Sequence, residues 1–349
     1  MTSPTIGHTA VPRVLLLGED APGALMHSYA TGFRRLGAAV STYCLMRASR
    51  ADFGSTLTRV GRKILPGALI RRVNARIVRE LAVRAADLVL VIKGELLLPT
   101  TVEALRASTG ALVTNYYPDD PFSSDPSMGL VAGAETLSAY DRCYTFARHL
   151  IEDFARAGVR EAEWLPFARD PDMHAPVPAV EPPEFDAVFV GNLDAERVRW
   201  LEPTASRFRL GIFGEHTRAA VPRTSSVARA TFLPAAYNRD LPRALARGAV
   251  ALNVMRVQNR RSHNMRSFES PASGAFTLSQ WTEELATMFE PAVEVVFAED
   301  PESMADTVGR WLPLQDQRRA IARAGFARVE HDTYEARART IMSSLLAPR

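Results

Sequence analysis

The stretch NMRSFESPASGAFTL places the carboxylate of Glu269 and the guanidinium of Arg266 among small and apolar residues. A charge in such surroundings is costly unless a partner compensates it. Asn264 is a good N-cap residue and predicts a short helix over 265–273, with Arg266 and Ser267 in its first turn. The positive end of a helix favours a phosphate, and a carboxylate can accept hydrogen bonds from both hydroxyls of a vicinal diol such as ribose. The alternative interpretation is a solvated acid on an ordinary helix.

A second candidate is the run VFVGNLDAERVRW, in which an apolar strand ends at Gly191 and Asn192 occupies the turn. Asp194 is a plausible N-cap for the following helix. Glycine lets a ligand approach the backbone, and Arg197 can add a charge-assisted hydrogen bond to phosphate. The run contains no full GxGxxG motif, so a tight turn without a ligand is an equal alternative.

A third candidate is NYYPDDPF, where Asp119 and Asp120 follow an apolar strand. Adjacent acids can hold a metal or supply a general base, but an Asp-Pro turn explains them equally well. His27 falls early in the first predicted helix and is a second candidate base. His174 lies in a Pro-rich segment and is interpreted as structural. His263 precedes Asn264 and is interpreted as a surface residue, with phosphate contact as the alternative.

Familiar catalytic motifs are absent from the sequence. It contains no HExxH, CxxC, P-loop or GxSxG. The usual support for a metalloprotease, a zinc site, a P-loop nucleotidase or an α/β-hydrolase is therefore missing.

The composition is that of a globular protein, with 349 residues, 47% hydrophobic and 23% charged. A net charge of +3 is too small to indicate nucleic acid as a partner. The excess of basic residues is concentrated over residues 47–84, which contain ten basic and two acidic residues. Apolar residues between these charges allow two interpretations, a solvated helical face or a surface for anionic lipid head groups or an acidic acceptor.

Cys44 and Cys143 each lie in an apolar run, and we expect both to be buried thiols in a reducing compartment. The N-terminus lacks the pattern of a signal peptide, and no run reaches the roughly 20 apolar residues of a membrane-spanning helix. We therefore expect a cytoplasmic protein, with peripheral contact to the inner membrane face through residues 47–84 as an open alternative.

Short apolar runs alternate with helical patterns along the whole chain, which predicts an α/β protein with parallel sheets covered on both faces. The Pro-rich segment DPDMHAPVPAVEPPEF interrupts this alternation. We predict a first Rossmann-like domain over 1–170, a linker over 171–184 and a second Rossmann-like domain over 185–332. The last helix, 333–349, is expected to pack back toward the first domain. Two doubly wound domains should face a central cleft, where such folds bind ligands.

The second half of the chain resembles a known family. The segments FDAVFVGNLDAERVRWL, NRDLPRALARGAVALNVMR, NMRSFESPASGAFTL, EDPESMADTVGRWL and HDTYEARARTIMSSLL are similar to the CgeB-type, spore maturation protein-like branch of GT-B glycosyltransferases, close to the group 1 transferases. The first half agrees through VIKGELLLPTTVEALRASTGALVTNYYPDDPF and LPFARDPDMHAP.

This resemblance implies two Rossmann-like domains that transfer a sugar from a nucleotide-diphosphate sugar to an acceptor hydroxyl. By position, Glu269 matches the acid that binds the donor ribose, and Arg266 with Ser267 matches the helix start that faces the diphosphate. The remaining donor-binding candidates are the glycine-turn residues and the end of the run AVALN, namely Gly191, Asn192, Arg197 and Asn253. Such enzymes usually need no metal, because a helix dipole and arginine neutralise the departing diphosphate.

The chain departs from the pattern at Arg261, where group 1 transferases often carry a further acid. Asp119 and Asp120 in the first domain, with His27, become the candidates for the base that activates the acceptor. The donor nucleotide, the sugar, the acceptor and the stereochemical outcome stay open. A nucleotide-sugar epimerase of the same fold and a non-catalytic nucleotide or sugar sensor are the alternative functions.

Overall fold

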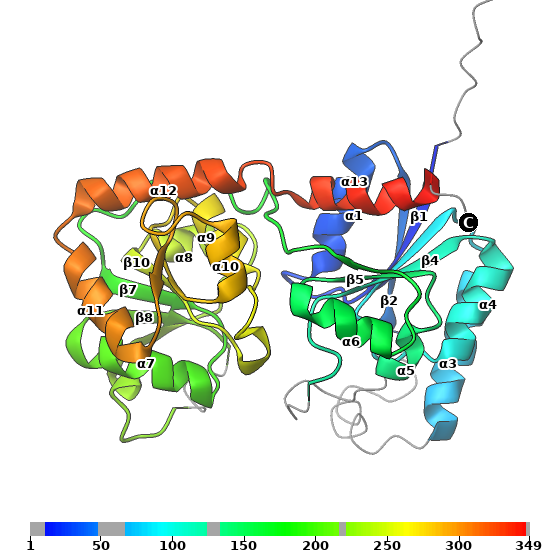
Figure 1. Ribbon diagram of the computed structural model, residues 1–349, viewed down its shortest axis with the longest axis horizontal. Coiled ribbons are helices and arrows are strands. Elements are labelled where there is room, and N and C mark those ends of the chain that lie inside the picture. Colours follow the sequence, from blue (N-terminus) through cyan, green and yellow to red (C-terminus); the bar gives the residue numbers. More distant parts are fainter. Residues whose placement is uncertain (1–10, 48–66, 124–132, 216–220, 347–349) are drawn as a thin grey trace, which may run out of the picture. The chain divides into compact units, whose positions relative to one another are not determined.

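The computed structural model describes residues 11–47, 67–123, 133–215 and 221–346. The chain forms two compact units, each built around its own six-stranded sheet (Figure 1). Unit 1 comprises the described parts of Met1–Thr145, Ile151–Glu163 and Glu335–Arg349, and unit 2 comprises Phe146–Leu150 and Trp164–Tyr334. The expected α/β class with two doubly wound sheets is confirmed.

The sheet of unit 1 has the strand order β2-β1-β3-β4-β5-β6. The pairs β1–β2, β1–β3, β3–β4 and β4–β5 are parallel. The strands are β1 (Arg13–Gly18), β2 (Ala39–Cys44), β3 (Leu88–Ile92), β4 (Leu112–Tyr117), β5 (Arg142–Thr145) and β6 (Ala162–Trp164). The helices are α1 (Leu25–Arg35), α3 (Gly67–Leu81), α4 (Pro99–Thr109), α5 (Gly133–Leu137), α6 (Ile151–Arg156) and α13 (Tyr334–Ser343). Strand β3 is buried at every position, as a continuous apolar run covered on both faces requires.

The sheet of unit 2 has the order β12-β11-β10-β7-β8-β9, with all of its neighbouring strands parallel. The strands are β7 (Phe185–Val190), β8 (Leu210–Phe213), β9 (Thr231–Leu233), β10 (Gly248–Asn253), β11 (Thr277–Gln280) and β12 (Val296–Ala298). The helices are α7 (Ala195–Arg207), α8 (Asp240–Leu245), α9 (Arg266–Ala272), α10 (Glu283–Met288), α11 (Pro301–Trp311) and α12 (Gln315–Val329).

Successive residues of β7 explain why both faces of this sheet carry helices. Ala187 and Phe189 belong to an apolar cluster with residues of α7, α11 and α12, whereas Val188 and Val190 belong to a second cluster with residues of α8. Because side chains alternate across a strand, a strand that is apolar at every position must be covered on both sides.

The strand order in unit 2 reverses direction between β7 and β10, which are hydrogen-bonded neighbours. Strands β8 and β9 extend the sheet on one side of this pair, and β11 and β12 extend it on the other. In open α/β sheets the carboxyl ends of the strands at such a reversal leave a crevice that binds ligands. The fold therefore directs attention to the residues that follow Val190 and Asn253.

The described part of the basic segment favours the solvated-face interpretation. Helix α3 directs Val73, Ile77 and Leu81 into the core of unit 1, while Arg71 and Arg79 are exposed. Among the described apolar residues of this segment, these three are therefore turned inward, whereas Val83, after the end of α3, is exposed. Residues 48–66, which carry the other half of the segment, lie outside the described residues.

Both cysteines are free thiols. Cys143 is fully buried, as expected, and burial raises the pKa of its thiol. Cys44 ends β2 and is only half-buried, so the expectation of burial is wrong for this residue. The strand β2 lies at the edge of its sheet, where side chains have fewer neighbours.

Candidate functional site

The turn after β7 is built around Gly191, whose φ is +159°. A Cβ atom at this position would lie 3.3 Å from the Phe189 ring and 3.8 Å from a terminal nitrogen of Arg197. The Asp194 carboxylate accepts a hydrogen bond from the Arg197 amide at 2.9 Å and caps α7, which confirms the predicted N-cap. The turn therefore presents bare backbone next to an arginine.

The Arg197 side chain ties this turn to the neighbouring strand. Its Nε donates to the carbonyl of Val254, just past β10, at 3.2 Å, and one terminal nitrogen donates to the carbonyl of Asn192 at 2.9 Å. Burial, followed by the nearby positive charges of Arg256 and Arg266, lowers the pKa of Arg197 to about 10. Three guanidinium groups therefore lie within electrostatic reach of one another, an arrangement that an anion would relieve.

Arg266 also contacts the end of β7, because its Nε donates to the carbonyl of Val190 at 3.2 Å. Its guanidinium forms an ion pair with Glu269, one turn further along α9. The side chain of Glu269 is only 3% exposed, so the solvated-acid interpretation is wrong. The carboxylate is a buried charge with a partner, as its cost requires.

A buried amide network holds the start of α9 against β10. The Asn253 amide nitrogen donates to the hydroxyls of Ser267 and Ser279, at 3.2 Å in each case, and its amide oxygen accepts from Asn264 at 2.9 Å. Asn253 is 2% exposed, and Ser267 is also buried. These residues support the site and shape the loop between β10 and α9.

Helix α9 is shorter than the predicted 265–273 and begins at Arg266. The Asn264 side chain still accepts a hydrogen bond from the Ser267 amide at 3.1 Å, although the residue directly before the helix is Met265. Gly274, with φ +76°, follows the last turn. A helix of seven residues has a small dipole, so positive charge at this site comes mainly from arginine side chains.

All seven donor-binding candidates therefore gather in unit 2 at the carboxyl ends of β7 and β10. Sequence reasoning missed two residues there. Arg256 follows β10 and lies 3.9 Å from Asp194, and His174 faces Glu269. Both residues lie in segments that carry the family resemblance, but only the folded chain shows which groups they contact.

In unit 1, Asp119 follows β4 and is engaged by a lysine that sequence reasoning missed. The Lys93 ammonium lies 2.9 Å from Asp119 and 3.0 Å from Glu95. Burial alone would lower the pKa of Lys93, but these two carboxylates outweigh it and raise the pKa. Lys93 has a positive φ of 67°, which is uncommon for a residue other than glycine. The position of Lys93 directly after strand β3 is the feature of the sequence that could have identified it as a candidate.

The other two candidate bases also have partners. The Asp120 carboxylate accepts from the Phe122 amide at 2.9 Å, which is the Asx turn that was the alternative for this residue. The Nε2 atom of His27 lies 3.0 Å from Asp20 in the loop after β1. The Asp119 carboxylate, as described above, is paired with the Lys93 ammonium.

His263 is fully buried, so its interpretation as a surface residue or phosphate ligand is wrong. Its Nε2 accepts from the Phe167 amide at 3.2 Å, and its Nδ1 lies 3.1 Å from Glu284. Burial alone would raise the pKa of Glu284, but the hydrogen bond and charge of His263 outweigh it and lower the pKa. Glu284 also accepts from the Trp164 indole at 3.0 Å, so this pair fastens chain segments together within unit 2.

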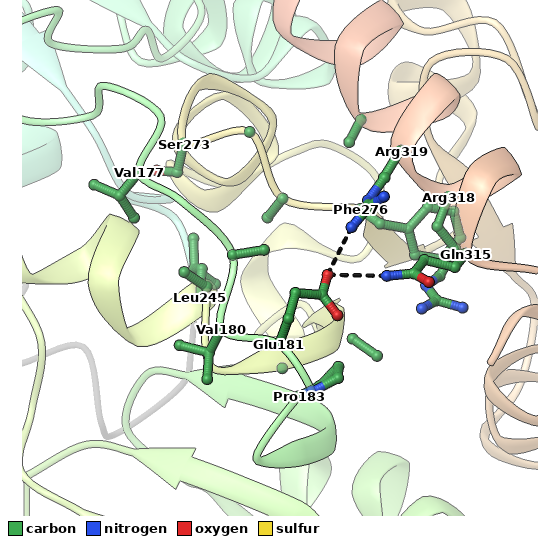
Figure 2. Close-up of a pocket in the computed structure, with 17 residues that line it drawn as sticks. Val177, Val180, Glu181, Pro183, Leu245, Ser273, Phe276, Gln315, Arg318 and Arg319 are labelled. Carbon is green, nitrogen blue, oxygen red and sulfur yellow. Dashed lines mark hydrogen bonds and ion pairs between the residues drawn. The ribbon is translucent and has the colours of Figure 1, made fainter.

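A cavity of about 90 Å³ lies at the opposite edge of the unit 2 sheet (Figure 2). It is lined by residues next to the amino-terminal ends of β7, β10 and β11, and by residues of α12. Glu181 accepts hydrogen bonds there from Gln315 and Arg319, at 2.9 Å in each case (Figure 2). Glu181, Gln315 and Arg319 thus pair with one another, whereas Arg318 donates to the carbonyls of Trp311 and Leu312.

Within the described ranges, no group of three or more His, Cys, Asp or Glu side chains could hold a metal ion. In the same ranges, the helices are all too short or too polar to cross a membrane.

Residues 197–343 match the model of a family described as glycosyl transferase-like. No curated protein sequence matches the chain. Several solved structures share its fold. Sucrose-phosphate synthase from Thermosynechococcus elongatus has 14% identity and a TM-score of 0.68, over 95% of this chain and 98% of that one.

Two further structures are similar over nearly their whole length. HepE from Anabaena, in complex with UDP-glucose, has 11% identity and a TM-score of 0.65, over 95% of this chain and 99% of that one. An α,α-trehalose-phosphate synthase from Burkholderia xenovorans, in complex with glucose-6-phosphate, has 13% identity and a TM-score of 0.65, over 95% of this chain and 100% of that one. The shared fold is that of the GT-B glycosyltransferases, which confirms the expected fold.

Proposed function

We propose that this protein transfers a sugar from a nucleoside-diphosphate sugar to an acceptor hydroxyl, without a bound metal, as the resemblance to the CgeB-type branch implies. The observation that carries the donor assignment is the convergence of a buried carboxylate and three arginines at the strand-order reversal of unit 2. HepE in complex with UDP-glucose, which has the same fold, supports a nucleotide sugar as donor.

The carboxylate and the arginines bind different parts of the donor, because one is an acceptor and the others are cations. Glu269 accepts hydrogen bonds from the ribose hydroxyls, because an ionised carboxylate is an acceptor only. Arg197, Arg256 and Arg266 face the diphosphate, and their charge stabilises the negative charge that develops when the glycosidic bond to phosphate breaks. The bare backbone of Gly191 allows the phosphates to approach closely. Arginine then supplies the charge that a metal ion supplies in other transferases.

The acceptor hydroxyl needs a base, and Asp119 is our first choice in unit 1. Its carboxylate lies 2.9 Å from the Lys93 ammonium, whereas the Asp120 carboxylate is engaged in its own turn. The carboxylate takes the proton of the acceptor hydroxyl as that oxygen attacks the donor carbon. The two free cysteines agree with a reducing, cytoplasmic location, which is part of this proposal.

Glu269→Gln tests the donor assignment. The amide keeps the shape of the side chain but loses the charge, so UDP or UDP-glucose should bind about 10- to 100-fold more weakly, as expected for hydrogen bonds to a charged group worth about 1.5–3 kcal/mol. Calorimetry measures the change in Kd. Glu284→Gln is the matched control, because Glu284 is an equally buried carboxylate beside a histidine and lies outside the proposed site.

Equal Kd values for wild type and Glu269→Gln would contradict the ribose assignment. Turnover is tested with a panel of nucleotide sugars, each with and without candidate acceptors. Release of nucleoside diphosphate only in the presence of an acceptor supports transfer, whereas interconversion of the donor sugar alone would favour an epimerase. Turnover should survive EDTA, and its loss with recovery on added Mg²⁺ would overturn the metal-independent mechanism.

A further inference from the structure

His174 lies in the Pro-rich segment before β7, yet its side chain is buried in unit 2, with 7% exposed. Its backbone closes a turn, because its amide donates to the carbonyl of Asp170 at 2.8 Å. The Asp170 carboxylate accepts from the Asp172 amide at 3.0 Å and stabilises the same turn. The imidazole is therefore held at a defined place by a segment without helix or strand.

The turn also determines which ring nitrogen of His174 carries the proton. The Asp170 amide donates to Nδ1 at 3.1 Å, so Nδ1 must be unprotonated. In the neutral ring the proton then lies on Nε2. Burial lowers the pKa of His174 against the opposing effect of Glu269, which keeps the neutral form at pH 7.

The protonated nitrogen faces the proposed ribose ligand. Nε2 lies 3.6 Å from Oε1 of Glu269, while the other carboxylate oxygen, Oε2, pairs with Arg266. A separation of 3.6 Å is too long for a direct hydrogen bond, and contacts of this kind often tighten when the ligand binds. A carboxylate offers about four lone-pair sites. With one used by Arg266 and one by Nε2–H, two sites remain for the two hydroxyls of a diol.

We propose that His174 is a positioning residue for Glu269: its Nε2–H and the Arg266 guanidinium hold the carboxylate from two sides, so that the remaining lone pairs face a ribose 2′,3′-diol. This inference rests on the proposed function and extends it to a residue in the Pro-rich segment. It also makes the diol a determinant of specificity, because a nucleotide that lacks one hydroxyl leaves a buried lone pair of Glu269 unsatisfied.

Two substitutions at this position separate positioning from packing. His174→Phe keeps an aromatic ring of similar size but has no donor. His174→Gln keeps an N–H donor of similar reach and cannot titrate. Binding of UDP and of 2′-deoxy-UDP to each variant is measured by calorimetry at pH 7.5. Thermal melting of each variant reports separately on the fold.

Wild type should bind UDP at least tenfold more tightly than 2′-deoxy-UDP. His174→Phe should weaken UDP binding about 5- to 20-fold and reduce the preference for the 2′-hydroxyl, and His174→Gln should restore both to within about threefold of wild type. If both variants melt at a lower temperature but bind UDP and 2′-deoxy-UDP as wild type does, His174 serves packing only and the proposal is overturned.

A second measurement needs no nucleotide and separates failure of this inference from failure of the proposed function. The ¹⁵N resonances of the His174 ring should report the Nε2–H form at pH 7.5. The charged groups that act on this ring are Glu269, Arg266, Asp170 and Arg169. Because the Glu269 charge raises the pKa of His174, Glu269→Gln should lower that pKa.

If wild type binds neither UDP nor GDP, the proposed function fails, and the ¹⁵N titration still decides whether His174 and Glu269 are coupled. An Nδ1–H ring, or a His174 pKa that does not change in Glu269→Gln, overturns the inference even if the nucleotide binds.

Discussion

At the scale of single residues, the candidate site depends on how buried charges are compensated. Glu269 is almost fully buried and has one cation, Arg266, in direct contact, with neutral His174 opposite. Arg266 is in turn held by the carbonyl of Val190 at the end of β7. The same contacts that stabilise unit 2 therefore also hold the groups that we assign to the donor.

Arg266→Ala should both destabilise unit 2 and weaken donor binding. It leaves the Glu269 carboxylate buried without its ion pair, and breaking a buried pair costs about 3 kcal/mol or more in the free energy of unfolding. Urea denaturation measures this loss. The double variant Arg266→Ala with Glu269→Gln should recover part of the stability, because it removes the uncompensated charge. Absence of any recovery would show that the pair is not coupled.

The burial of His174 predicts a dependence of stability on pH. The native pKa is lowered from the value of 6.5 expected for the unfolded chain, so the unfolded state holds more protons at acidic pH. The free energy of unfolding should therefore decrease as the pH falls below about 6.5. Above that pH, the stability contributed by the neutral His174 should be fully present. Melting temperatures of wild type and His174→Gln between pH 5 and 8 measure it. Parallel curves for the two proteins would contradict the prediction.

At the scale of elements, the sequence predicted which helices and strands form better than it predicted the residues at which they begin and end. Apolar runs identified most strands of the two sheets but not the three-residue β9, and the Asp194 cap located the start of α7. Helix α9 begins one residue later than predicted, because the loop network of Asn253 and Asn264 occupies its start. The basic run over α3 showed its character only in the fold, which turns the apolar residues inward. Periodicity alone does not state which side of a helix meets a core.

Helix α12 packs closely against α9 at Gly325. A Cβ atom there would lie 2.5 Å from the carbonyl oxygen of Glu294 and 3.4 Å from Pro271 in α9. Gly325→Ala gains about 1 kcal/mol in helix propensity, but backbone overlap of this kind costs about 1–3 kcal/mol or more. We therefore expect net destabilisation in urea, with weaker nucleotide binding because α9 shifts.

Gly309→Ala in α11 is the control for this prediction. Its Cβ would meet the far end of the half-buried Phe208 ring at 3.2 Å, and that ring can move aside. This variant should be close to neutral in stability. A Gly325→Ala protein at least as stable as wild type would show that α12 can move without cost.

At the scale of the whole molecule, the proposed donor site and the cavity around Glu181 lie at different edges of the unit 2 sheet. The carboxyl edge of this sheet carries Gly191, Arg266 and Glu269, whereas the cavity around Glu181 lies at the amino edge (Figure 2). The cavity is small, and its carboxylate, Glu181, is already bound by Gln315 and Arg319. At the carboxyl edge, the positive charges of Arg256 and Arg266 act on the buried Arg197, and this is the place that we propose for the diphosphate.

Hydrogen exchange distinguishes these two places in the intact chain. Saturation with UDP should slow exchange of amides over 191–197 and 264–269, because ligand binding to the native state suppresses local opening. Amides over 179–183 should exchange at an unchanged rate. Protection at 179–183 with no change at 191–197 would move the nucleotide to the cavity of Figure 2. The exchange rates of amides in unit 1, measured without UDP, serve as the reference for both segments of unit 2.

The sequence by itself determined the α/β class, the candidate residues and the resemblance to GT-B transferases, because apolar runs, caps and glycine turns are local signals. Only the tertiary structure decided that β7 and β10 are neighbours, that Arg266 pairs with a buried Glu269, and that His174 from the Pro-rich segment faces the same carboxylate. These contacts join segments far apart in the chain. Strand order and the need to compensate buried charge determine which residues meet, and local periodicity in the sequence reports neither of them.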